Sequence, residues 1–109
     1  MTMTDYSAMR QRLEGEFREL LTRHGRISAH LRNEDREVPD DWTEMAQFME
    51  NDEVLEALEE HSREQLDAIR LAVNRIEEGT YGTCGSCDSA ISGERLDLIP
   101  TAAVCAACA

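Results

Sequence analysis

The sequence has few of the features that build a compact globular core or a membrane span. Aromatic residues make up 5% of the chain and charged residues 31%, a balance more typical of long exposed helices than of a globule. No apolar run approaches the roughly 20 residues that cross a bilayer, so we expect no membrane contact. The start of the chain lacks the basic residues and apolar run of an export signal, which predicts a reducing, cytoplasmic environment.

Lysine is absent. The chain has 11 basic residues, all of them arginine, and 23 acidic residues, which gives a net charge of −12. Such an acidic surface repels phosphates, which disfavours specific contact with DNA and favours a basic protein surface as partner. We find no glycine-rich phosphate loop after a predicted strand and no carboxylate pair that can be assigned to a pocket. We therefore expect a protein that is not an enzyme.

The four cysteines form two pairs, Cys84 with Cys87 and Cys105 with Cys108, separated by 17 residues. This spacing is typical of a structural zinc site, in which four thiolates surround one Zn²⁺ and leave no open position for catalysis. Disulfides would need an oxidising compartment, and a redox pair of the thioredoxin type needs only one such motif. Metal binding of this kind contributes about 10–16 kcal/mol to folding, so we expect the segment to unfold without zinc.

The first half of the chain predicts a helix with a heptad seam, which requires a partner helix. The seam positions follow alternating steps of four and three: Tyr6, Arg10, Leu13, Phe17, Leu20, His24, Ile27 and Leu31. The histidines have no metal-ligand spacing, so we expect no catalytic role for them.

A second helix is predicted from Trp42 to about residue 78. Pro39 favours a turn at Val38, Asp41 and Glu44 form the pattern of a capping box, and Gly79 ends the helix. Its apolar positions are Phe48, Leu55, Leu58, Ile69, Ala72 and Ile76, with Met45, Leu66 and Val73 beside them.

The predicted fold class is therefore mainly α. A long antiparallel α-helical hairpin, or coiled coil, occupies residues 1–78 with an acidic tip near 35–46, and a four-cysteine zinc-finger module follows at 79–109. We expect short strands around the zinc site and a monomer, because the seam is satisfied within the chain.

Several side chains near the turn allow two interpretations. Met45, Phe48 and Met49 fit helix packing better than a binding site, and the acidic runs at 50–53 and 59–60 fit solvated faces. Trp42 either packs against the hairpin end or projects as an anchor for a partner.

Residues 76–87 resemble the zinc-finger signature of the DksA/TraR family, and the resemblance includes the residues between the cysteines. It continues through Ile91, Arg95, Leu96, Pro100 and the segment 105–108. The resemblance implies a coiled-coil protein that enters the secondary channel of bacterial RNA polymerase and modulates initiation without specific DNA contacts.

The tip pattern of that family, Asp-x-x-Asp-x-Ala, corresponds here to residues 41–46. The resemblance therefore implies partner-binding roles for Asp41, Trp42, Glu44 and Ala46, with Glu44 one methylene longer than the family's aspartate. In long members of the family, basic residues help bind guanosine tetraphosphate. The matching positions here are Ala68, Ile99 and Ala109, so strict dependence on this alarmone is not expected. Two alternatives stay open: a zinc-held redox switch, and a general protein-interaction module without polymerase activity.

Overall fold

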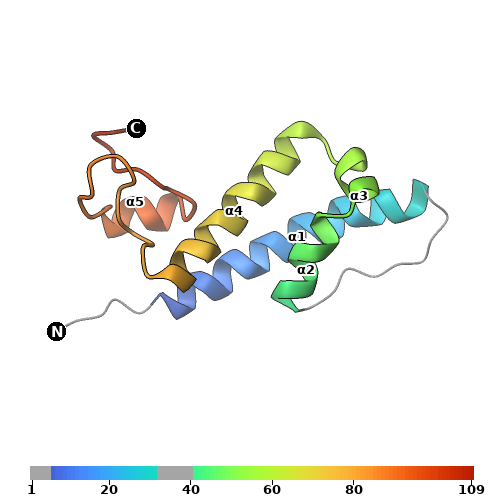
Figure 1. Cartoon of the computed structure of the whole chain (residues 1–109), viewed down its shortest axis with the longest axis horizontal. Helices are drawn as coiled ribbons and strands as arrows, with labels where there is room; N and C mark the ends of the chain where they lie inside the picture. Colours follow the sequence, from blue (N-terminus) through green and yellow to red (C-terminus); the bar gives the residue numbers. More distant parts are fainter. Residues whose placement is uncertain (1–5, 32–40) are drawn as a thin grey trace. The chain divides into compact units, whose positions relative to one another are not determined.

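The computed structural model describes residues 6–31 and 41–109 and is mainly helical (Figure 1). Its helices are α1 (Ser7–Leu31), α2 (Trp42–Met49), α3 (Asp52–Ala57), α4 (Glu60–Glu78) and α5 (Gly93–Leu98). Within the described ranges the strands expected around the cysteines reduce to one isolated antiparallel bridge between Thr83 and Ala90. The predicted turn at Val38 and Pro39, and the tip residues before Asp41, lie outside the described residues. No described helix has the length and apolarity to span a bilayer.

The chain packs as two compact units. The described part of one comprises residues 6–13 and 68–109, and that of the other comprises residues 14–31 and 41–67. The division at residue 78 between a hairpin and a zinc finger stays a prediction.

In the unit of residues 14–67, α2 is attached to α1 by an edge-to-face contact between Phe17 and Trp42, whose ring centroids are 4.8 Å apart. Phe17 and Leu21 are fully buried, whereas Leu20, the predicted seam residue, is only half-buried. The buried side chains Leu13, Phe17 and Leu21 follow successive i, i+4 steps, which also place residues on one helix face, and the predicted step of three after Phe17 was wrong. The other buried apolar side chains of this unit are Met45, Met49, Val54, Leu58 and Leu66.

The second predicted helix is not continuous, because the chain leaves the helix at residues 50–51 and again at 58–59. The acidic residues at 50–53 and 59–60 explain why the helix is interrupted at these two places. Neither α2 nor α3 has a basic residue in its last turn, so Glu50 and Glu59 meet the negative end of a helix dipole, while Asp52 and Glu60 suit the positive end of the next helix. Asn51 also competes for backbone hydrogen bonds. These acids are exposed, as predicted for solvated faces, but they also mark helix boundaries.

In the other unit, the first turns of α1 lie beside the last turns of α4. Arg10 Nη2 and Glu77 Oε1 form a partly exposed ion pair 2.6 Å apart, and the rings of Tyr6 and Tyr81 pack edge to face at 4.7 Å. The buried apolar side chains of this unit are Leu13, Ile69, Ala72, Val73, Tyr81, Cys84, Ile91, Leu96 and Ala102.

Helix α4 ends as predicted at Gly79, which adopts a positive φ of 80°. The amide of Thr80 donates to the carbonyl of Arg75 at 2.9 Å, and the amide of Gly79 donates to that of Ile76 at 3.2 Å. These two bonds form a Schellman motif, which satisfies the last carbonyls of the helix. The chain is thereby turned out of α4 and toward the first cysteine pair.

Candidate metal centre

The first cysteine pair lies on a tight turn between Thr83 and Ala90. The amide of Cys84 donates to the carbonyl of Ser89 at 2.8 Å, and the amide of Asp88 donates to the carbonyl of Cys84 at 3.0 Å. Asp88 closes the turn with a φ of 62°, a left-handed conformation that aspartate tolerates better than most residues. This turn directs both thiols of the pair to one side.

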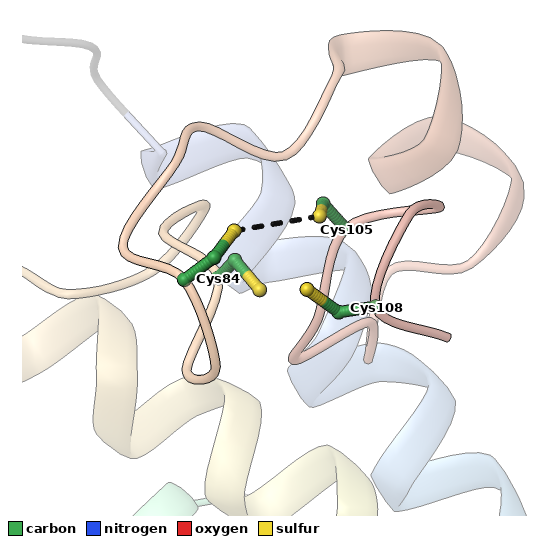
Figure 2. Close-up of side chains that lie close together, drawn as sticks. Cys84, Cys105 and Cys108 are labelled. Atoms are coloured by element: carbon green, nitrogen blue, oxygen red, sulfur yellow. Dashed lines mark hydrogen bonds between the residues drawn. The ribbon is translucent and has the colours of Figure 1, made fainter.

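The second pair lies on a similar turn, in which the amides of Cys108 and Ala109 both donate to the carbonyl of Cys105 at 3.0 Å. The two turns are joined by the amide of Gly85, which donates to the carbonyl of Ala103 at 2.9 Å. Figure 2 shows the sulfurs of Cys84, Cys105 and Cys108 directed toward one another. Four thiols from two distant segments therefore converge on one point.

The four Sγ atoms lie within 4.8 Å of one another, and those of Cys87 and Cys105 are 3.7 Å apart. Four sulfurs at about 2.3 Å from a central Zn²⁺ occupy the corners of a tetrahedron with edges of about 3.8 Å. All four cysteines are free thiols. The geometry and the donor set fit one tetrahedral zinc ion.

Hydrogen bonds to sulfur favour the thiolate form in the first pair. The backbone amide of Cys105, with the amides of Ser86 and Cys87, lowers the pKa of Cys84 to about 6 against the opposing effect of burial. The hydroxyl and backbone of Ser89 lower the pKa of Cys87. Amides directed at sulfur thus stabilise the charge that a metal ligand must carry.

The opposite holds for Cys108, whose pKa is raised to about 12 by hydrogen bonding with the sulfurs of Cys105, Cys87 and Cys84. A thiol surrounded by other sulfurs keeps its proton, because a further thiolate would add like charge. A bound divalent cation reverses this balance, so metal binding releases protons. Cys87 and Cys108 are exposed, and the interpretation as a redox switch stays a prediction.

The predicted tip residues that the structure describes lie at the start of α2. Asp41 is the N-cap, and its Oδ2 accepts the amide of Glu44 at 3.2 Å, as predicted for a cap. Trp42 is half-buried against Phe17, which favours its interpretation as a packing residue. Asp41 and Glu44 are exposed and Ala46 is half-buried; their role in partner binding stays a prediction.

Met45 and Met49 are 2% and 1% exposed and Phe48 is half-buried, which favours the interpretation of this group as helix packing. His61 is exposed near the start of α4.

Three side chains that donate to the backbone before Cys105 were not predicted as site residues. Tyr81 Oη donates to Pro100 O at 2.7 Å, Arg75 Nη2 to Thr101 O at 3.3 Å, and Arg95 Nε to Val104 O at 3.0 Å. Tyr81 and Arg95 belong to the stretches that carry the family resemblance, but a sequence does not show which carbonyl a side chain will reach.

Two family models match the chain in succession. The first, described as the DnaK suppressor protein-like N-terminal domain, covers residues 9–76, and the second, the prokaryotic dksA/traR C4-type zinc finger, covers residues 79–109. The second match includes all four cysteines whose sulfurs converge.

Two solved structures are similar. One is a DnaK suppressor protein from Agrobacterium tumefaciens C58, with a TM-score of 0.70 and 36% identity over 99% of this chain and 93% of that one. The other is transcription factor DksA2 from Pseudomonas aeruginosa, with a TM-score of 0.62 and 31% identity over 92% of this chain and 76% of that one.

Among curated sequences, an uncharacterized protein of Aquifex aeolicus is 37% identical over 76 residues, which are 70% of this chain and 52% of the relative. The uncharacterized protein YteA of Bacillus subtilis is 46% identical over 46 residues, which are 42% of this chain and 19% of the relative. The chain thus spans about half the length of the first relative and a fifth of the second.

From the two successive family matches, the convergent thiols and the similar structures, we conclude that the chain belongs to the DksA/TraR family of C4-type zinc-finger proteins.

Proposed function

We propose that this protein regulates transcription by binding bacterial RNA polymerase through its secondary channel. Support comes from the family matches, which together span residues 9–76 and 79–109, and from the similarity to a protein named as a transcription factor. The net charge of −12 is consistent with a basic protein surface as partner and with the absence of specific DNA contacts.

The observation that carries the proposal is the pair of exposed carboxylates at the start of α2. Asp41 and Glu44 are three residues apart and both accessible, and the contact between Trp42 and Phe17 anchors this end of the helix on α1. Carboxylates bind Mg²⁺, the cation of polymerase sites. An acidic helix end that approaches the catalytic centre therefore has suitable chemistry to alter initiation there.

We further propose that this activity does not strictly depend on guanosine tetraphosphate. The positions that the family resemblance associates with the alarmone hold the half-buried Ala68, the exposed Ile99 and the exposed Ala109. None of these side chains can pair with a phosphate. Regulation should therefore persist when the alarmone is omitted.

The decisive experiment is in vitro transcription with purified RNA polymerase and charge-removing variants of the two acids. Asp41→Asn removes the carboxylate but keeps a side chain that caps helices well, so a loss of regulation cannot be assigned to a lost cap. Glu44→Gln and Glu44→Ala test the second acid, and Glu44→Asp tests the extra methylene. Glu64→Gln removes one exposed charge from α4 and is the matched control.

We expect Asp41→Asn, Glu44→Gln and Glu44→Ala to reduce regulation by at least about 10-fold, because they remove a carboxylate whose position at the catalytic centre the proposal requires and even a misplacement of about 1 Å can cost up to 100-fold. Glu44→Asp keeps the charge and the family's own residue, so it should preserve or increase regulation, and Glu64→Gln should leave it unchanged. Crosslinking from position 44 should label the secondary channel. The proposal is wrong if the native protein neither crosslinks there nor alters initiation at any promoter tested.

A further inference from the structure

The backbone that leads into the second cysteine pair is irregular and satisfies only part of its carbonyl groups internally, since the amide of Ala102 donates to the carbonyl of Ile99 at 2.9 Å. Residues 99–104 belong to no helix or strand, although Ala102 within them is buried. A buried carbonyl without a donor costs free energy comparable to a lost hydrogen bond. The carbonyls of the half-buried Pro100, Thr101 and Val104 take their donors from other parts of the chain.

They come from three side chains on separate segments. Tyr81, which follows α4, donates to Pro100 O at 2.7 Å; Arg75, on α4, donates to Thr101 O at 3.3 Å; and Arg95, on α5, donates to Val104 O at 3.0 Å. We call these three residues the carbonyl clamp. All of them belong to the unit that contains the cysteines.

The clamp acts at the residue that precedes a metal ligand. Arg95 holds the carbonyl of Val104, and the next residue is Cys105. On the other side, the amide of Gly85, between Cys84 and Cys87, holds the carbonyl of Ala103. The segment before the second cysteine pair is thus held by one hydrogen bond from the turn of the first pair and by three hydrogen bonds from side chains that do not ligate metal.

We propose that Tyr81, Arg75 and Arg95 are positioning residues of the metal centre, which hold the segment before Cys105 in the register that four-sulfur coordination requires. The metal and the clamp constrain the same backbone. Each therefore strengthens the other, since coupling between two binding equilibria is reciprocal. Arg75 extends this coupling to the last turns of α4.

The three donors should differ in strength. The guanidinium groups of Arg75 and Arg95 carry charge, and charge-assisted hydrogen bonds are about twice as strong as neutral ones. Tyr81 is a neutral donor, and the residue is only 4% exposed, so loss of its hydroxyl removes the donor of Pro100 O in a largely buried environment. Arg95 is nearest to a ligand and should have the largest effect.

The test is a competition for zinc between the full-length protein and a chromogenic chelator. Arg95→Met and Arg75→Met remove the donor but keep an unbranched side chain, Arg95→Lys restores a donor, and Tyr81→Phe removes one oxygen while leaving the ring on Tyr6. The control is Arg23→Met, because Arg23 pairs with Glu19 in the other unit.

We expect Arg95→Met to weaken zinc affinity by about 10-fold, the lower end of the range for outer-shell partners of metal ligands. Tyr81→Phe should weaken it by about 5-fold, as for loss of one neutral hydrogen bond. Arg95→Lys should stay near the native affinity, and Arg23→Met should have no effect. In zinc-loaded Arg95→Met, the amide of Gly85 should also exchange faster with solvent, because its acceptor is no longer held.

Two results would overturn the proposal. One is a zinc affinity within 2-fold of the native protein for both Arg95→Met and Tyr81→Phe. The other is an equal loss in the clamp variants and in Arg23→Met, which would indicate general destabilisation. Far-UV circular dichroism of the zinc-loaded variants verifies folding, because Trp42 lies in the unit without the cysteines, and Tyr81→Phe keeps the test valid if an arginine variant does not fold.

Discussion

Gly79 and Gly82 both have positive φ, of 80° and 82°, but their surroundings differ. A Cβ at Gly79 would meet no atom within 4 Å, whereas a Cβ at Gly82 would lie 2.5 Å from the hydroxyl of Tyr6. The sequence indicated the first glycine as a helix end. The sequence could not indicate that Gly82 is required, because the atom that excludes a side chain there is the hydroxyl of Tyr6, far away in the chain.

We therefore expect Gly82→Ala to destabilise the zinc-loaded protein more than Gly79→Ala. Left-handed backbone costs either alanine about 1–2 kcal/mol, and at Gly82 the displaced Tyr6 also loses its edge-to-face contact with Tyr81, worth about 0.5–1.5 kcal/mol. Urea unfolding measures both changes. In a Tyr6→Phe background the excess cost at Gly82 should fall, and an unchanged excess would exclude the Tyr6 clash as its cause.

At the scale of elements, local signals located the helix ends better than the buried faces. Asp41 and Gly79 were identified because a cap or a C-terminal glycine acts through bonds to nearby backbone. The interruptions near Asn51 and Glu59 were missed because periodicity was followed across acidic runs that suit helix termini. The burial of Leu21 in place of Leu20 was missed because the heptad places a step of three after Phe17, whereas the buried face continues by a second step of four.

The cap of α2 gives a prediction for this element. Asp41→Ala should destabilise the unit of residues 14–67 by about 1 kcal/mol, and Asp41→Asn by much less, because asparagine accepts the same amide hydrogen bond. Trp42, the next residue, reports this change through its fluorescence during urea unfolding. Gln47→Ala, an exposed position on the same helix, should have little effect; similar losses for Asn and Ala at position 41 would argue against capping as the cause.

At the scale of the whole molecule, the two units depend on different forces. The unit of residues 14–67 buries Phe17, Leu21, Met45, Met49, Val54, Leu58 and Leu66. The segment after Gly79 buries fewer large apolar side chains and has four thiols that converge on one point. Zinc binding, at about 10–16 kcal/mol, can supply the folding free energy that this segment lacks.

Removal of zinc with a strong chelator should therefore unfold residues 81–109 selectively. Hydrogen exchange should rise across this segment and reach the last turns of α4, while the fluorescence of Trp42 keeps its native emission. Readdition of zinc should restore protection. If the Trp42 emission shifted to that of the urea-unfolded chain, the two units would not unfold separately.

The sequence by itself determined the metal ligands, the helical class and the principal helix ends, because cysteine spacing, caps and apolar periodicity act over a few neighbouring residues. Only the tertiary structure decided the contact of Trp42 with Phe17, the close approach of Tyr6 to Gly82 and the carbonyls reached by Tyr81, Arg75 and Arg95. All of these contacts except that of Arg95 with Val104 join residues that are distant along the chain. Their geometry depends on how whole segments pack, which no local pattern specifies.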